Sequence, residues 1–128
     1  LVKEHGIKRG VALPVTAPFH CPLMQPAADA MAEALARTPP SALRVPLFAN
    51  VTASVVTDPA EVQRLLVEQV CGRVRWRESV IAMQAAGVDQ FVELGGKVLG
   101  PMIGRCVSDV SVTSVIGMAD IEALLAGL

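Results

Sequence analysis

The stretch "TDPAEVQRLLVEQVCG", Thr57 to Gly72, predicts a helix with a defined start and a defined end. Asp58 can cap the helix, Pro59 takes the first helical position and Glu61 stands in capping-box register. Apolar residues recur at helical spacing up to Gly72, which stops the helix. The last-turn carbonyls of such a helix lack intrahelical donors and carry the negative end of its dipole.

Further helices and strands are predicted on both sides of this helix. The helices are expected at Leu23–Thr38, at Trp76–Ala86, after the glycine-rich turn of "GGKVLGPMI" (95–103), and at Ala119–Ala126. The strands are expected at Lys8–Val15, at Leu47–Val51, in "VDQFVEL" (88–94) and in "VSVTSVI" (110–116). This alternation is typical of an α/β fold with a parallel or mostly parallel sheet.

Composition favours one globular domain, or a piece of a larger one, and argues against several classes of function. The chain has 128 residues, of which 52% are hydrophobic and 18% charged, and its formal net charge is -1. We expect no nucleic-acid partner, because phosphate binding needs concentrated Lys and Arg. We expect no membrane span either, because the apolar stretches are short. Three cysteines without a CxxC pair suit a cytoplasmic location.

One histidine lies in an unusually stiff segment. "LPVTAPFHCPLM", Leu13 to Met24, holds the residues before its prolines extended and places His20 on a short loop between a strand and a helix. A packed core histidine is one interpretation and a catalytic base is the other. A base needs a partner that fixes its tautomer. A last-turn carbonyl at roughly Val67 to Val70 could accept its hydrogen bond, and the residue pattern leaves open which one.

No nucleophile or metal site accompanies this histidine in the sequence. None of the serines is flanked by glycines as in the G-x-S-x-G elbow. Cys21 follows His20 directly, but adjacent side chains on an extended segment point apart, so we assign Cys21 to packing. The histidines and cysteines lack the paired spacing of metal ligands. "LGGKVLG" (94–100) fits no phosphate-binding pattern and is interpreted as a tight strand-to-helix turn.

Four segments carry a family resemblance. "LPVTAPFHCPLMQPAADAM", "VPLFANVT", "LLVEQVCGRVRWRESV" and "FVELGGKVLGPM" closely resemble malonyl-CoA:acyl carrier protein transacylases of bacterial type II fatty acid synthesis. They also resemble, less closely, the acyltransferase domains of polyketide and fatty acid synthases. The resemblance implies the C-terminal portion of such an enzyme. Residues 1–14 would end a ferredoxin-like small subdomain, and residues 15–128 would form the C-terminal part of a hydrolase-like parallel-sheet core.

The same resemblance implies roles for four residues. His20 matches the family's catalytic histidine, and Gln69 matches the residue whose backbone carbonyl orients that histidine. Asn50 is expected to border the site, with a simple turn residue as the alternative. Phe19 resembles the "xAFH" form associated with malonyl over methylmalonyl units. No metal and no bound cofactor are implied, since the substrates are malonyl-CoA, a coenzyme A thioester, and the phosphopantetheine thiol of acyl carrier protein.

The parts that this family uses for first contact with substrate are expected outside the chain. They are the serine of a GHSxG elbow, the arginine that pairs with the malonyl carboxylate, and the oxyanion-hole donors. The serine nucleophile would belong to a missing N-terminal part, so the chain alone is predicted to transfer no malonyl. The family's G-(P/A)-G-K-V-L turn is also one residue short here, at Gly95-Gly96-Lys97.

Three alternatives remain open at this point. The chain could be a non-catalytic module that binds acyl carrier protein or a partner subunit through the basic residues Lys97, Arg105 and Arg75. It could be a piece of a polyketide-type acyltransferase domain. It could also be a fragment without a function of its own, whose open sheet edge would favour association.

Overall fold

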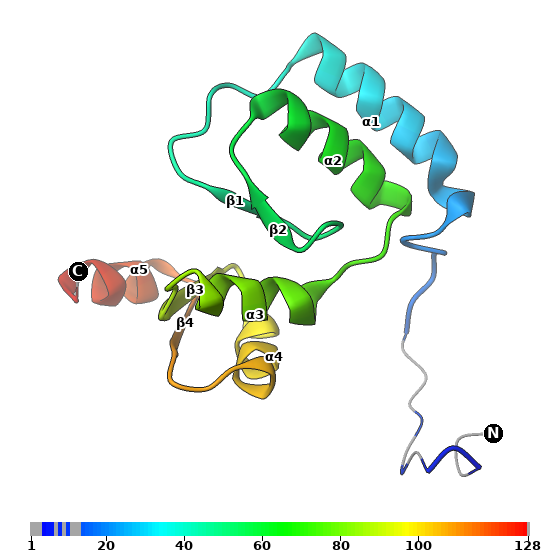
Figure 1. The fold of residues 1–128 in the computed structure, drawn as a ribbon. Helices are drawn as coiled ribbons and strands as arrows, with labels where there is room; N and C mark the ends of the chain where they lie inside the picture. The colour runs from blue at the N-terminus through cyan, green and yellow to red at the C-terminus, as the bar shows by residue number, and fades with distance from the viewer. Residues whose placement is uncertain (1–3, 7, 9, 11–13, 128) are drawn as a thin grey trace.

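The computed structural model describes residues 4–6, 8, 10 and 14–127 (Figure 1). The first half of this region holds the 3-10 turn η1 (Pro22–Met24), α1 (Gln25–Arg37), β1 (Leu47–Ala49), β2 (Ser54–Val56) and α2 (Pro59–Cys71). The second half holds α3 (Trp76–Ala85), β3 (Gln90–Leu94), α4 (Leu99–Cys106), β4 (Ser111–Val115) and α5 (Met118–Ala126). The predicted α/β class and its main helices are therefore confirmed.

Helix α2 occupies the centre of the first half. Figure 1 shows α1 and α2 side by side, with the β1–β2 hairpin beneath α2. One cluster of buried residues comes from the hairpin and from α2: Ala49, Val56, Val62 and Leu65. Ala28 of α1 is buried as well. Because the same face of α2 packs on the hairpin, the position of its last turn depends on this small core.

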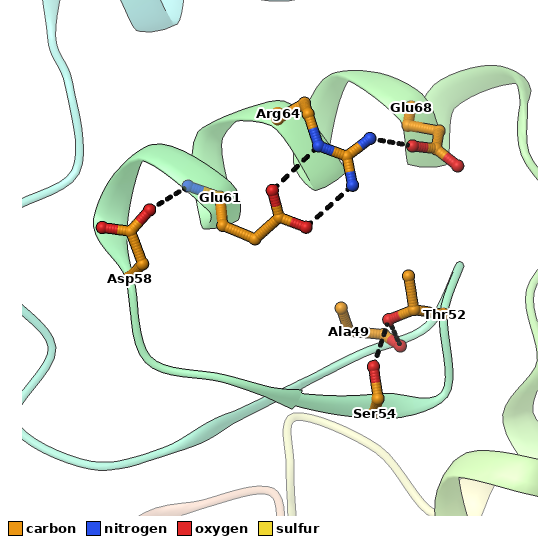
Figure 2. A network of polar contacts seen from close by, with 7 residues as sticks. All are labelled: Ala49, Thr52, Ser54, Asp58, Glu61, Arg64 and Glu68. Carbon is orange, nitrogen blue, oxygen red and sulfur yellow. Dashed lines mark hydrogen bonds and ion pairs between the residues drawn. The ribbon is translucent and has the colours of Figure 1, made fainter.

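The start of α2 has the predicted Asp58 cap and Pro59, but the Glu61 carboxylate bonds Arg64 and so does not complete a capping box. The Asp58 carboxylate accepts a hydrogen bond from the Glu61 amide at 2.9 Å, and Pro59 begins the helix (Figure 2). Arg64 lies between Glu61 and Glu68, at 2.8 Å and 2.6 Å from their carboxylates (Figure 2). The hydrogen bond from Arg64 lowers the pKa of Glu61. These ion pairs are exposed and contribute little to stability, so the cap and the buried face define the helix.

The sheet differs from the prediction. β3 and β4 are parallel, with Gln90 opposite Ser111 and Leu94 opposite Val115, but β1 and β2 form a separate antiparallel hairpin. Within the described residues, the predicted parallel arrangement is therefore limited to the β3–β4 pair. The three-residue β2 is too short to show a period of two in the sequence, and a tight turn at residues 50–53 joins it to β1. Ala53 adopts a φ of 55° in that turn and donates its amide to the Ala49 carbonyl at 2.8 Å.

The strand predicted at residues 8–15 falls mainly outside the described residues. The described residues of that segment, Lys8, Gly10, Pro14 and Val15, lie in no strand. Among the described residues, no helix has both the length and the apolar character needed to cross a membrane.

A buried carboxylate organises the glycine-rich turn between β3 and α4. Glu93 is 8% exposed and accepts hydrogen bonds from the amides of Val98, Leu99 and Gly100 at 2.8–3.0 Å. The Leu99 amide is the main cause of the lowered pKa of Glu93. These amides, at the N-terminus of α4, are the groups that would otherwise bind an anion. The interpretation of this segment as a structural turn is confirmed.

We predict that Glu93→Gln destabilises the fold at neutral pH, because its amide would place an N–H group against the amides of the turn. The lowered pKa means that the carboxylate stabilises the fold fully above the ordinary glutamate value of 4.5, and that this contribution is lost as the pH falls through the lowered value. The difference in unfolding free energy between wild type and Glu93→Gln should therefore shrink in acid. Urea unfolding at neutral and acidic pH measures it, with the exposed Glu122→Gln as control. Equal stability of Glu93→Gln and wild type at neutral pH would contradict the assignment.

Candidate active site

His20 lies in a tight turn just before η1, and its backbone is strained. Its φ of 57° is in the left-handed region. Few residues other than glycine adopt this conformation, although His does so more often than most. The Phe19 amide donates to the Ala17 carbonyl at 2.9 Å, and the Cys21 thiol donates to the Pro18 carbonyl at 3.0 Å. Such outliers persist where the surroundings enforce them, and they cluster at functional sites.

The His20 ring meets the end of α2. Its Nδ1 lies 3.1 Å from the main-chain carbonyl oxygen of Gln69 in the last turn of that helix. The predicted contact between the histidine and a last-turn carbonyl is thus present, at Gln69. His20 itself is exposed to solvent, so the packed-core interpretation does not hold. Whether the two residues are catalytic remains a prediction at this point.

The contact determines what the ring can do chemically. A carbonyl oxygen only accepts hydrogen bonds, so it favours the tautomer that carries the proton on Nδ1. Nε2, across the ring, then holds a lone pair and can accept a proton. The negative end of the α2 dipole also favours a ring that becomes positively charged. The arrangement therefore suits a general base that is oriented without a carboxylate.

Gly72 allows the end of α2 to approach the hairpin turn closely. A Cβ at this position would lie 2.8 Å from the Glu68 carbonyl oxygen and 2.8 Å from Cγ2 of Val51. The Gly72 amide donates to the Glu68 carbonyl at 2.8 Å, so the neighbouring Gln69 carbonyl remains for His20. The sequence indicated Gly72 as a stop signal, but this close packing depends on the tertiary fold.

Arg75 fixes the turn that carries Asn50. The Arg75 amide donates to the Asn50 carbonyl at 2.9 Å, and its guanidinium donates to the Thr52 carbonyl at 3.1 Å. The guanidinium also lies 3.5 Å from Glu78. One alternative from the sequence assigned Arg75 to the docking of a partner, and it missed that Arg75 binds the carbonyls of the hairpin turn. The available signal was its position immediately before α3, in the short link after α2.

The structure brings Asn50 and Gln69 to one small cavity but leaves Phe19 outside it. Both line a cavity of about 160 Å³ with otherwise apolar walls from β1 and α2. Among the hydrogen bonds of the described residues, none joins Asn50 to His20. Phe19 precedes His20 in the turn, and its side chain is 59% exposed. The expected roles of Asn50 and Phe19 remain predictions.

A second cavity, of about 410 Å³, lies between α3 and α4. Its apolar surface includes Trp76 and Met102, and its basic residues are Arg73, Arg77 and Arg105. Glu78 also lines it and approaches Arg73 at 3.7 Å. Within the described residues, no three side chains of the His, Cys, Asp and Glu types gather as metal ligands.

Comparison with known proteins gives a consistent picture. No family model matches the chain. The malonyl CoA-acyl carrier protein transacylase of Bacillus subtilis is 41% identical over 106 residues, covering 82% of the chain and 33% of that protein. The transacylase of the same name from Salmonella typhimurium is 40% identical over 124 residues, covering 96% of the chain and 40% of that protein. The chain thus spans 33–40% of the length of these curated relatives.

Solved structures agree. An acyl-carrier-protein-S-malonyltransferase from Bartonella henselae matches with a TM-score of 0.88 and 46% identity, covering 98% of the chain and 40% of that protein. A malonyl-transacylase in complex with its type II polyketide synthase acyl-carrier protein matches with a TM-score of 0.88 and 33% identity. This match covers 98% of the chain and 41% of that protein. These matches confirm the resemblance found in the sequence motifs.

We predict that Gly72→Ala lowers the unfolding free energy by about 1–3 kcal/mol, the usual effect of overpacking, because its Cβ would meet backbone and Val51. The matched control is Gly104→Ala on the exposed face of α4, where a Cβ meets nothing within 4 Å. The control should be neutral or stabilising, since alanine favours helix. Denaturant unfolding measures both. A Gly72→Ala chain as stable as wild type would show that the close approach is not needed.

Proposed function

We propose that this chain, which is homologous to part of the malonyl CoA-acyl carrier protein transacylases, contributes the general base of a malonyl transferase. The reaction is malonyl transfer from malonyl-CoA to acyl carrier protein through a serine acyl-enzyme, in fatty acid biosynthesis. The observation that carries the proposal is the 3.1 Å contact between His20 Nδ1 and the Gln69 carbonyl. It is supported by similarity over nearly the whole chain.

In this proposal each proton has a stated donor and acceptor, and the contact between His20 Nδ1 and the Gln69 carbonyl supports the role of the ring. Nε2 of His20 takes the serine proton as the serine oxygen attacks the thioester carbon. The resulting imidazolium donates from Nδ1 to the Gln69 carbonyl and returns the Nε2 proton to the leaving coenzyme A sulfur. The phosphopantetheine sulfur of acyl carrier protein then attacks the malonyl-serine carbon as His20 takes the thiol proton, and His20 returns that proton to the leaving serine oxygen, a ping-pong sequence. A positioned base of this kind contributes on the order of 10²–10⁴ in rate.

The serine, the arginine for the malonyl carboxylate and the oxyanion-hole donors lie, in this proposal, on polypeptide beyond the 128 residues. The share of the relatives that the chain matches, 33–40%, supports this. So does β3, which pairs only with β4 among the described residues and leaves Val92 and Leu94 46% and 77% exposed. Residues 15–128 would then complete a hydrolase-like parallel-sheet core, and residues 1–14 would end a ferredoxin-like subdomain. We place the protein in the cytoplasm, where its three free thiols stay reduced.

The cavity between α3 and α4 favours a second candidate function. Arg73, Arg77 and Arg105 surround an apolar surface there, which suits an acidic protein such as a carrier. A chain that bound acyl carrier protein through this cavity without taking part in transfer would be a docking module. The two candidate functions differ in the role of His20, which is required for malonyl transfer but not for docking.

We predict that joining this chain to the remaining N-terminal part of a relative, such as the Bartonella henselae enzyme, gives a protein that transfers malonyl to acyl carrier protein. His20→Ala in that protein should lower the transfer rate by at least about 10²-fold, because the base is lost. His5→Ala is the matched control and should transfer at the wild-type rate. Incorporation of labelled malonyl into the carrier measures all three.

The 128-residue chain alone should transfer no detectable malonyl, since it carries no elbow serine. Transfer by the chain alone, or an unchanged rate in the His20→Ala protein, would contradict the proposal. Carrier binding with no effect of His20 would favour the docking module.

A further inference from the structure

The side chain of Gln69, and not only its main-chain carbonyl, lies at the His20 ring. Its amide nitrogen Nε2 donates to the Gly72 carbonyl at 3.1 Å and lies 3.4 Å from His20 Nδ1. Its amide oxygen Oε1 is buried and has no hydrogen-bond partner. One residue thus presents two groups to the same ring nitrogen, an acceptor at 3.1 Å and a donor at 3.4 Å.

The Gly72 carbonyl fixes which way the amide points. If the amide were flipped, Oε1 would face the Gly72 carbonyl oxygen, and two acceptors cannot bond to each other. The present orientation leaves Oε1 buried and unpaired, which is itself unfavourable. The fold therefore keeps the donor next to Gly72 even though an acceptor is left without a partner.

The two contacts of Nδ1 differ in quality. The 3.1 Å distance to the Gln69 carbonyl is within the usual range for N–H···O bonds, whereas 3.4 Å to Nε2 is beyond it. Nε2 is already committed to Gly72, so it competes weakly for the ring. Its main effect is on the backbone, because it ties Gly72 to Gln69 across the last turn of α2.

We propose that the side-chain amide of Gln69 is a positioning group that selects the Nδ1–H tautomer of His20. It does so by holding the Gly72 carbonyl, which fixes the last turn of α2 with the Gln69 carbonyl facing the ring. The contribution of the Gln69 side chain to malonyl transfer rests on the proposed function, because only a histidine that acts as a base needs Nε2 unprotonated. The contacts themselves do not depend on that function.

The test is nitrogen NMR of the 128-residue chain with labelled histidine, at a pH where the ring is neutral. In wild type, the ring nitrogen shifts should report the Nδ1–H tautomer as the major form. Gln69→Met, which keeps length and helix preference but lacks the amide, should make Nδ1–H the minor form. Gln63→Met, earlier on the same helix, is the matched control and should keep the wild-type tautomer.

A folded Gln69→Met chain in which Nδ1–H remains the major tautomer would overturn the proposal. If Gln69→Met does not fold, the wild-type chain still decides through its own Gln69 side-chain NH2 signals. One of these hydrogens should exchange with solvent at least about tenfold more slowly than those of Gln63, as expected for a hydrogen bond within the structure. Equal solvent exchange rates for the side-chain NH2 hydrogens of Gln69 and Gln63 would overturn the proposal. No substrate is present in either experiment, so failure here is distinguishable from failure of malonyl transfer.

Discussion

The hydrogen bond between His20 Nδ1 and the Gln69 carbonyl depends on a helix that ends in the right place. A carbonyl in the last turn of a helix needs a partner from outside the helix, and here the imidazole is that partner. In the proposed function, this interaction takes the place of the carboxylate that usually orients a catalytic histidine. The acceptor is a neutral peptide group, and the helix dipole adds partial negative charge to it. The proposed role of His20 as a base depends on this single contact.

The surrounding structure fixes both ends of that helix. Asp58 caps its start, and the buried residues Val62 and Leu65 seat it on the hairpin. At the other end, Gly72 lets Val51 approach, and Arg75 holds the turn that contains Val51 through two carbonyls. His20 belongs to a separate segment, the turn before η1, and its backbone is in the left-handed region. The site therefore forms where three segments meet: the end of α2, the hairpin turn at residues 50–53 and the loop that carries His20.

The sequence predicted the parts whose causes are local. The start and end of α2 were readable because Asp58, Pro59 and Gly72 act on their own neighbours. The residues alone suggested a last-turn carbonyl as the histidine's partner, but only the family resemblance pointed to Gln69, since the choice depends on how distant segments pack. The short β2, the left-handed φ of His20 and the use of Arg75 as a clamp were not readable. Each depends on contacts between residues far apart in the chain, or on too few residues to form a pattern.

The most direct test of this account is a through-hydrogen-bond NMR coupling between Nδ1 of His20 and the carbonyl carbon of Gln69. Selective labelling of histidine nitrogen and glutamine carbonyl carbon would allow the coupling to be assigned to this pair. We expect a resolved coupling in the neutral ring, because the Nδ1 proton is shared with that oxygen at 3.1 Å. A neutral ring that carries its proton on Nε2, with no coupling to the Gln69 carbonyl, would contradict the account.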